Sequence, residues 1–335
     1  MKRTIIFVLT LFVSITLFAQ GRPKVGLVLG GGGAKGAAEA GALKVIEKSG
    51  VPIDYIAGTS IGSIVGGLYS LGYRSEDIEE MFRSQSWTSL LTDRNDSLSH
   101  KLFGRDSTGV RYILGFPVRR RGTAQADSLH GAFKGAKIMA LLDSMVELSP
   151  VERHVRGARR IPFRCVAVDV SHGEFREIVL SPDSAPLACC MRASMAIPGV
   201  FKPMKIGENT LIDGGALNNL PVDVVRNMGA DYVIAIDLQQ NKHDDYKSPL
   251  RFLKGRSGAA SWLKNRPDVA KYNNMRHSAD IYINPDLGNY DVMSFNNDAI
   301  NDMIDMGYKA ANKEYKQLVK LAKKVNGAKK KKRRK

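Results

Sequence analysis

Two consecutive segments near the start of the chain each combine a short apolar run, a glycine-rich turn and a stretch with helical periodicity. "VGLVL" at 25–29 runs into four glycines and then into a helical stretch, Ala34 to Ser49, that ends at Gly50. "DYIAG" at 54–58 leads into a second helical stretch, Ser60 to Leu71. Strands that alternate with helices in this way form a parallel sheet covered by helices. The pattern predicts an α/β fold.

The remainder of the chain continues the alternation of strands and helices. Its 335 residues, 44% of them hydrophobic, suffice for one large domain with an ample core. No internal repeat or linker interrupts it, so we expect a single domain over residues 20–320. We predict strands at 161–170, 174–180, 231–238 and 280–285 and one that ends in "LIDGG", helices at 136–146, about 186–195 and about 297–321, and loops over 93–130 with one strand-like run, "VRYILGF".

"GTSIG", residues 58–62, has the G-x-S-x-G spacing of a nucleophile elbow. In such a turn the serine stands at a sharp bend between a strand and a helix, and Gly58 and Gly62 leave the room that the bend requires. A serine hydroxyl is a weak nucleophile until a base takes its proton. Ser60 is therefore a candidate nucleophile that needs a base.

The loop after the first strand, "GGGAKG", has two interpretations. Its G-x-G-x-x-G spacing is typical of dinucleotide binding, which also requires an acidic residue at the end of the second strand. "AGTSIG" stands at that place instead, and no Gly-Lys-Ser/Thr follows the glycines as a P-loop would require. Nucleotide binding is therefore disfavoured.

The same loop suits an oxyanion hole. Glycines at the start of a helix expose backbone N–H groups that converge on one point and can stabilise a developing oxyanion. The elbow on the next strand would place Ser60 beside these donors, and a lysine in the loop adds positive charge nearby. The candidate residues of the loop are Gly31, Gly32, Gly33, Lys35 and Gly36.

A candidate base follows the apolar residues Leu211 and Ile212 in "LIDGGALNNLPVDV". Asp213 ends a strand there and precedes Gly214 and Gly215. Asp-Gly is also common in tight turns, which is the structural alternative. Partial burial would raise the pKa of the Asp213 carboxyl and make it a better base. A direct Ser–Asp dyad would then need no histidine.

These motifs together resemble those of the patatin-like phospholipases. "GGGAKG", "GTSIG", "RASMAIPGVF" at 192–201 and "DGG" followed by "NNLPVDV" occur in the family's order, and the resemblance covers about residues 24–315. It implies a three-layer αβα sandwich with a mostly parallel central sheet. It also implies a Ser–Asp dyad, with Ser60 as nucleophile and Asp213 as base, acting on acyl esters of lipids without a metal or other cofactor. Many members have Asp at the position of Gly30 and Arg at that of Lys35.

Two other functions are compatible with parts of the sequence. An α/β-hydrolase triad would require a histidine after Asp213, and only His243 and His277 follow it. Both stand in polar surroundings, without the apolar strand end expected of a catalytic histidine. The second alternative is a catalytically inert lipid-binding protein, which the intact serine, aspartate and glycines argue against.

The first residues have the layout of a secretory signal peptide. Lys2 and Arg3 precede an apolar run, Thr4 to Phe18, and Ala19 is followed by polar residues. The run is shorter than the roughly 20 residues of a membrane span, which favours cleavage after Ala19 over an uncleaved anchor. We therefore expect an exported bacterial protein that is periplasmic, associated with the outer membrane or secreted.

The positive charge of the chain gathers at its other end. Ten of the 17 excess positive charges lie between Lys320 and Lys335, where no acidic residue occurs. For an exported protein an anionic lipid surface is a more natural partner of this tail, 321–335, than nucleic acid; a solvated end without a partner is the alternative. The three cysteines, Cys165, Cys189 and Cys190, neither form a disulfide framework nor join a metal-binding cluster.

Overall fold

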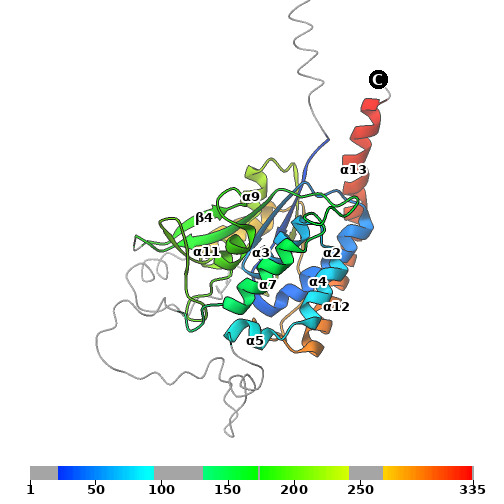
Figure 1. Ribbon diagram of the computed structural model, residues 1–335. Coiled ribbons are helices and arrows are strands. Elements are labelled where there is room, and N and C mark those ends of the chain that lie inside the picture. The colour runs from blue at the N-terminus through cyan, green and yellow to red at the C-terminus, as the bar shows by residue number, and fades with distance from the viewer. Residues whose placement is uncertain (1–21, 94–130, 173, 241–266, 334–335) are drawn as a thin grey trace, which may run out of the picture.

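The computed structural model describes residues 22–93, 131–172, 174–240 and 267–333 (Figure 1). The predicted signal peptide, the strand-like run at 110–116 and His243 lie outside these residues. Within them, one sheet has the strand order β5-β6-β3-β2-β1-β7-β8, with β4 paired to β3. The strands are β1 Val25–Leu29, β2 Tyr55–Thr59, β3 Phe163–Asp169, β4 Arg176–Leu180, β5 Met204–Ile206, β6 Asn209–Asp213, β7 Tyr232–Ile236 and β8 Ile281–Ile283.

The centre of the sheet is parallel and one side is antiparallel. β1 pairs in parallel with β2 and β7, β2 with β3, and β7 with β8. β3 is antiparallel to β4 and β6, and β6 to β5. This arrangement confirms the expected α/β fold with a mostly parallel central sheet.

Helices cover both faces of the sheet. The helices are α2 Ala37–Ser49, α3 Ile61–Ser70, α4 Ser75–Ser84, α5 Trp87–Thr92, α7 Ala136–Glu147, α8 Leu187–Ser194, α9 Val222–Asn227, α11 Pro267–Ser278, α12 Asn297–Lys313 and α13 Tyr315–Arg333. Leu27 and Leu29 of β1 point to the core beneath α2, α3 and α12, whereas Val28 points to the core beneath α9 and α11. The molecule is therefore a three-layer αβα sandwich, in which α2, α4 and α12 lie side by side (Figure 1).

The end of the chain differs from the sequence prediction. One helix was expected over about 297–321, but α12 ends at Lys313 and α13 runs from Tyr315 to Arg333. Leu321 and Val325 of α13 are buried against the body. The tail boundary drawn at 321 therefore falls inside a packed helix, because a 3.6-residue apolar repeat continues among the lysines.

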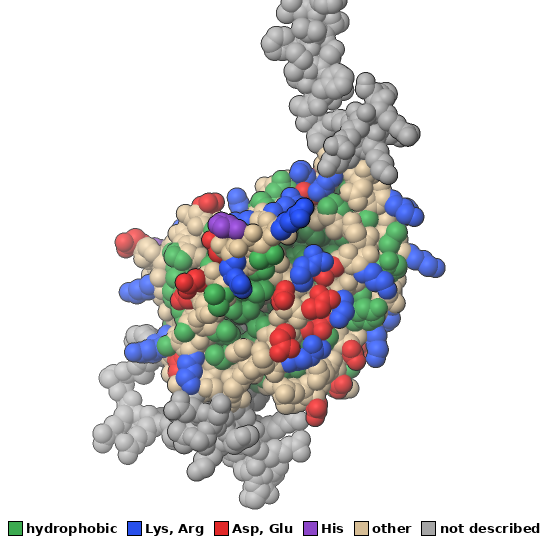
Figure 2. All heavy atoms as spheres, turned by 45° about the vertical axis from the view of Figure 1, so that its right-hand side comes forward, with side chains coloured by type: hydrophobic (Ala, Val, Ile, Leu, Met, Phe, Trp, Pro, Cys, Tyr) green, Lys and Arg blue, Asp and Glu red, His purple; other side chains and the backbone are tan. Residues whose placement is uncertain are grey.

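The surface over α2, α4 and α12 carries charges of both signs. In Figure 2, which brings this side forward, Lys and Arg side chains alternate with Asp and Glu. Lys44 of α2 lies 3.6 Å from Glu79 of α4, and Arg83 forms an ion pair with the same carboxylate at 3.1 Å. The excess positive charge of the chain is therefore not located on this face. No helix of the described residues combines the length and apolarity needed to cross a membrane.

Candidate active site

The pairing of β3 brings the two proposed catalytic residues together. Val166 of β3 pairs with Thr59, the last residue of β2, and the next residue, Ala167, pairs with Asp213, the last residue of β6. Because β4 occupies the other side of β3, β2 and the antiparallel β6 lie on the same side and meet end to end. Ser60 follows Thr59 directly. The nucleophile and the carboxylate therefore face each other, although 153 residues separate them along the chain.

Ser60 stands at a strained bend between β2 and α3. Its φ of 55° lies in the left-handed region, which non-glycine residues seldom adopt, and strained residues of this kind cluster at functional sites. Its N–H donates to Ser194 Oγ at 3.0 Å, and that hydroxyl in turn donates to the carbonyl of Val166 at 2.6 Å. Ser194 belongs to the segment 192–201, which was singled out by its resemblance to the family. No local pattern in that segment indicates that it contacts the elbow.

The flanking glycines of the elbow are required by close approach. A Cβ on Gly58 would lie 2.2 Å from the carbonyl oxygen of Gly62, and one on Gly62 would lie 2.3 Å from that of Leu29. Backbone atoms cannot move aside as a flexible side chain can. The G-x-S-x-G spacing therefore reflects the packing of the elbow against β1 and α3.

Asp213 accepts a hydrogen bond from the candidate nucleophile. The hydroxyl of Ser60 donates to Asp213 Oδ2 at 2.6 Å, and the N–H of Gly215 donates to the other carboxylate oxygen at 2.8 Å. Burial raises the pKa of Asp213 to about 6, while the hydrogen bonds from Ser60 and Gly215 oppose that rise. A carboxyl with this pKa is ionised at neutral pH and can accept a proton from a serine.

The glycine loop offers two free backbone donors beside Ser60. The N–H groups of Gly30 and Gly31 donate to the carbonyls of Ile236 and Asn219, and those of Ala34 and Lys35 to other carbonyls. Within the residues that the structure describes, the N–H groups of Gly32 and Gly33 have no partner. These two N–H groups are therefore available for the oxyanion hole that the sequence predicts.

The other predicted loop residues support this arrangement. A Cβ on Gly36 would lie 2.3 Å from Ile61 Cγ1, and one on Gly214 would lie 2.2 Å from the carbonyl oxygen of Val166. Lys35 is half-buried; burial lowers the pKa of its ammonium group and Asp291 opposes that shift. The structure thus places all the predicted glycines and the dyad in one region.

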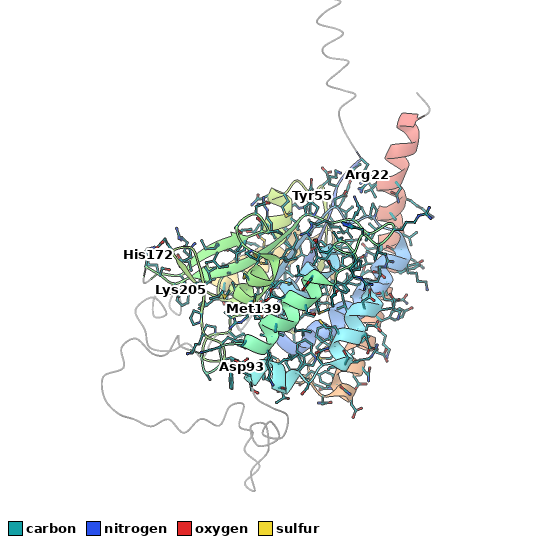
Figure 3. The ribbon with its side chains drawn as sticks, in the orientation of Figure 1. Arg22, Tyr55, Asp93, Met139, His172 and Lys205 are labelled. Atoms are coloured by element: carbon teal, nitrogen blue, oxygen red, sulfur yellow. The ribbon has the colours of Figure 1, made fainter. Side chains whose placement is uncertain are left out.

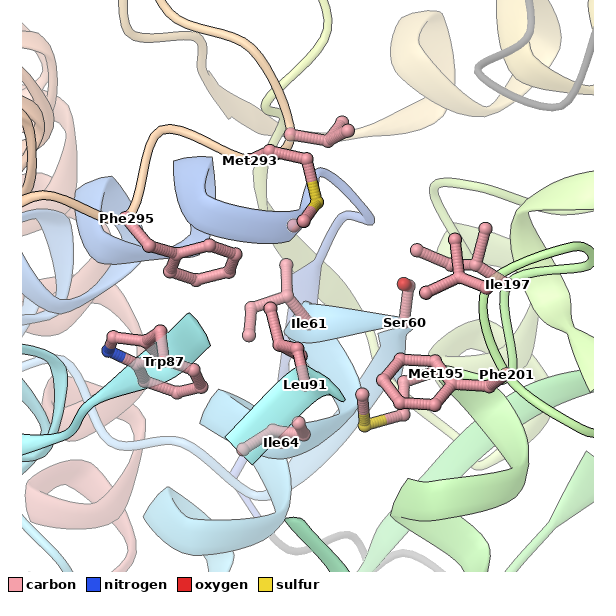
Figure 4. A pocket seen from close by; sticks show the side chains of 13 residues that line it. Ser60, Ile61, Ile64, Trp87, Leu91, Met195, Ile197, Phe201, Met293 and Phe295 are labelled. Atoms are coloured by element: carbon pink, nitrogen blue, oxygen red, sulfur yellow. The ribbon is translucent and has the colours of Figure 1, made fainter. Parts of the chain in front are cut away.

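An apolar pocket opens beside Ser60. It has an empty volume of about 440 Å³, part of which is open to solvent. In Figure 4, Ile61, Leu91 and Ile64 lie between Ser60 and Phe295. The stacked rings of Trp87 and Phe295, 5.0 Å apart, form part of the wall. The lining residues are Gly33, Ser60, Ile61, Ile64, Trp87, Leu91, Met195, Ile197, Val200, Phe201, Val292, Met293 and Phe295.

Six of the thirteen lining residues lie outside the motifs described above: Ile64, Trp87, Leu91, Val292, Met293 and Phe295. Trp87 and Leu91 come from α5, and residues 292–295 come from a loop before α12. Single apolar residues in distant segments resemble ordinary core residues, so no sequence pattern distinguishes them. The same holds for Gln239, which contacts the glycine loop. Asn219, which also contacts it, stands in the "NNLPVDV" motif, but nothing in that motif indicates the contact.

The histidine alternative finds no support in the described residues. His277 is exposed at the end of α11, a few residues before β8 begins, whereas Ser60 follows the carboxyl end of the parallel strand β2. His277 therefore lies at the opposite edge of the sheet. The direct contact between Ser60 and Asp213 also leaves no space for an intervening imidazole. Among the described residues, no group of His, Cys, Asp and Glu side chains could hold a metal ion.

Comparison with known proteins relates the chain to one family. The model of the family described as "Patatin-like phospholipase" matches residues 27–226. The chain is 35% identical over 216 residues to the patatin-like phospholipase domain-containing protein ZK370.4 of Caenorhabditis elegans, a match that covers 64% of this chain and 13% of that protein. It is 32% identical over 226 residues to the human patatin-like phospholipase domain-containing protein 6, covering 66% and 14%.

A third relative is the lysophospholipase nte1 of Emericella nidulans, with 28% identity over 317 residues that cover 88% of this chain and 18% of that protein. The chain thus spans less than a fifth of the length of these relatives. Among solved structures, VipD of Legionella pneumophila superposes with a TM-score of 0.48 at 16% identity, covering 89% of this chain and 67% of that one. From the family model that spans both Ser60 and Asp213, we conclude that the chain belongs to the patatin-like phospholipase family.

Proposed function

We propose that the chain is a serine hydrolase that cleaves acyl esters of lipids with a Ser–Asp dyad. The observation that carries the proposal is the 2.6 Å hydrogen bond from Ser60 Oγ to a buried carboxylate beside an apolar pocket. The family membership and the names of the relatives support the same reaction class. Ser60 is the proposed nucleophile and Asp213 the proposed general base.

The proposed reaction proceeds in two steps. Ser60 Oγ attacks the ester carbonyl carbon while its proton passes to Asp213 Oδ2, and the carbonyl oxygen, now an oxyanion, accepts hydrogen bonds from the N–H groups of Gly32 and Gly33. The C–O bond to the alcohol then breaks, and Asp213 returns the proton to the leaving oxygen. In the second step Asp213 takes a proton from water, the hydroxide attacks the acyl-enzyme, and Ser60 recovers its proton as the free acid leaves.

The pocket supports a lipid rather than a polar ester as substrate. Apart from Gly33 and Ser60, its lining consists of aliphatic, aromatic and methionine side chains. Each methylene of an acyl chain that enters such a pocket contributes about 0.8 kcal/mol to binding. The acyl chain therefore occupies the pocket, and the ester carbonyl is held at its mouth beside Ser60.

The dyad can be tested with two conservative variants. Ser60→Ala and Asp213→Asn should each lose nearly all esterase activity with an unchanged fold, and the double variant should be hardly worse than either one, because the pair acts as a unit. Wild-type turnover in Asp213→Asn would contradict the dyad.

A fluorophosphonate should label Ser60 in the wild type and not in Ser60→Ala. Absence of labelling in the wild type would favour an inert lipid-binding protein. Mass spectrometry of products from phospholipids, lysophospholipids and neutral lipids would then identify the substrate class.

We also propose that the protein is an exported bacterial member of the family and that its basic tail contacts an anionic lipid surface. A mature protein that begins at Gln20 would be the direct evidence of cleavage. Lys324 of α13 lies over the ring of Tyr232, the first residue of β7, at 4.6 Å, and Asn326 contacts the carbonyl of Gly50. Both contacts lie at the amino edge of the parallel strands.

That edge is opposite to the pocket. Figure 3 shows Arg22 and Tyr55 at the end of the molecule where α13 projects, and Asp93, next to α5, at the other end. The tail therefore serves as a tether that raises the concentration of the enzyme near a lipid surface and does not itself press the pocket against that surface.

A further inference from the structure

The carbonyl oxygen of Gly31 is held by two side-chain amides from outside the glycine loop. Gln239 Nε2 donates to it at 2.7 Å, and Asn219 Nδ2 donates to it at 3.2 Å. The N–H of Gly31 also donates to the backbone carbonyl of Asn219 at 3.2 Å. Three hydrogen bonds therefore fix the orientation of Gly31 with respect to the segments after β6 and β7.

The orientation of this carbonyl determines that of the next N–H group. The peptide bond between Gly31 and Gly32 is planar and trans, so its C=O and N–H groups point in opposite directions. With the Gly31 carbonyl directed at the two amides, the Gly32 N–H must point away from them. It is one of the two N–H groups of the loop that lack a partner in the described part of the chain. Hydrogen bonds to a peptide oxygen also polarise the peptide and strengthen its N–H as a donor.

The backbone of Gln239 is itself held in place. Its backbone N–H donates to Asp237 Oδ1 at 3.0 Å, and its backbone carbonyl accepts from Asn284 Nδ2 at 2.8 Å. Asp237 is fully buried and accepts hydrogen bonds from the hydroxyls of Tyr272 and Tyr282. A residue held in this way can keep the loop that it contacts in a defined position.

Asn219 connects the glycine loop with the loop of the base. A Cβ on Gly31 would lie 2.4 Å from Asn219 Oδ1, and a Cβ on Gly215 would lie 2.7 Å from the same atom. Gly215 is the residue whose N–H binds Asp213. The Asn219 amide is thus packed between the two loops, and a side chain at either glycine would displace it.

We propose that Asn219 and Gln239 are positioning residues of the oxyanion hole: by holding the Gly31 carbonyl they aim the Gly32 N–H at the oxyanion. This inference rests on the proposed serine hydrolase function. Because the amides act on a donor that matters most when the carbonyl oxygen becomes charged, their loss should affect the transition state more than substrate binding.

The test replaces the amide of Gln239 with a carboxylate of nearly the same shape. Gln239→Glu places an oxygen, instead of an N–H donor, against the Gly31 carbonyl. Gln240→Glu is the matched control, because Gln240 Nε2 donates to the carbonyls of Leu238 and Pro285 and does not contact the glycine loop. Gln239→Met removes the donor without adding charge. Each variant is assayed as the full chain with a soluble ester and with a trifluoromethyl ketone, which forms a tetrahedral oxyanion on the serine.

The expected result is a loss confined to the transition state. Complete removal of one oxyanion donor lowers kcat by about 10²- to 10³-fold, and misdirection of a donor should cost about 10- to 100-fold. In Gln239→Glu and Gln239→Met, kcat should fall in this range, KM should stay within about twofold, and the affinity for the ketone should fall in proportion to kcat/KM. Gln240→Glu should match the wild type, and all folded variants should have similar melting temperatures.

Two outcomes would overturn the assignment. One is a Gln239→Met enzyme with the kcat and ketone affinity of the control; the other is a loss of kcat that leaves the affinity for the ketone unchanged. If Gln239→Glu does not fold, Gln239→Met decides alone. An active Ser60→Ala would refute the proposed hydrolase itself, whereas an inactive Ser60→Ala together with fully active Gln239 variants refutes only the positioning role.

Discussion

Replacement of Asp213 by asparagine should abolish activity and at the same time stabilise the protein above pH 6. The wild-type base must be ionised to accept a proton from Ser60, and burial raises its pKa to about 6 from the usual 3.8. Below pH 6, kcat/KM should therefore fall about tenfold per pH unit, and above pH 6 it should level off. Burial raises the pKa and so makes Asp213 a better base. The same burial makes the negative charge of Asp213 unfavourable in the folded state.

The size of that cost follows from the shift. Below pH 3.8 the carboxyl is protonated in both the folded and the unfolded chain, so Asp213 does not lower the free energy of unfolding. Between 3.8 and 6 only the unfolded chain releases the proton, and the penalty grows with pH. Above pH 6 it is constant at about 3 kcal/mol, from roughly 1.4 kcal/mol per pKa unit. Asparagine keeps the shape without the charge, so Asp213→Asn should melt about 5 °C higher than the wild type at pH 8 and at the same temperature near pH 4.

Asp169 provides a control of opposite sign. It is also buried, but the hydrogen bonds from Ser171 and Arg176 outweigh the effect of burial and lower its pKa to about 2. Asp169→Asn should therefore destabilise the protein at pH 8 and leave the pH–rate profile unchanged. Differential scanning calorimetry and initial rates on a soluble ester, both from pH 4 to 9, measure these effects. A wild-type kcat/KM that stays level down to pH 4.5, or an Asp213→Asn variant that is less stable at pH 8, would refute this account of the base.

Four further outcomes are expected. Gly33→Ala should lower kcat on a soluble ester by about 10²-fold or more, because the residue has a φ of +59° and a Cβ would lie 2.3 Å from the carbonyl oxygen of Val292. Leu91→Trp should narrow the pocket and lower the ratio of long-chain to short-chain ester hydrolysis. His243→Ala and His277→Ala should stay within a few-fold of wild-type rates; a loss of about 10³-fold in either would restore the triad hypothesis. Deletion of 329–335 should weaken co-sedimentation with anionic vesicles at low salt. The difference should shrink as salt is added, because charges are screened over roughly 8–10 Å at physiological ionic strength. Hydrolysis of a soluble ester and binding to neutral vesicles should not change.

The local elements of the site could be read directly from the sequence. β1, the glycine turn, α2, β2 and the elbow follow one another without a break, and each has its own pattern of apolar residues and glycines. The expected strand at 25–29 coincides with β1, and the helix expected from Ser60 begins at Ile61. Such predictions succeed because hydrophobic period and turn chemistry act over a few residues.

The walls of the site could not be read in this way. Trp87, Leu91 and Phe295 are apolar residues in short segments, and nothing in their neighbourhood indicates that they face a pocket instead of the core. The extension of α13 into the basic tail was missed for a related reason. Leu321 and Val325 are recognised as buried only when the body against which they pack is known.

Ser60 and Asp213 show most clearly which properties of the site are local to the sequence and which depend on the tertiary structure. The sequence by itself determined that a serine stands in a strained turn and that an aspartate follows an apolar strand, since these are local properties of short segments. Only the tertiary structure decided that the two meet. Consecutive residues of β3 pair with the ends of β2 and β6, and that register places Ser60 Oγ 2.6 Å from the carboxylate. Register between strands from distant parts of the chain depends on packing across the whole sheet, so no short segment of sequence contains it.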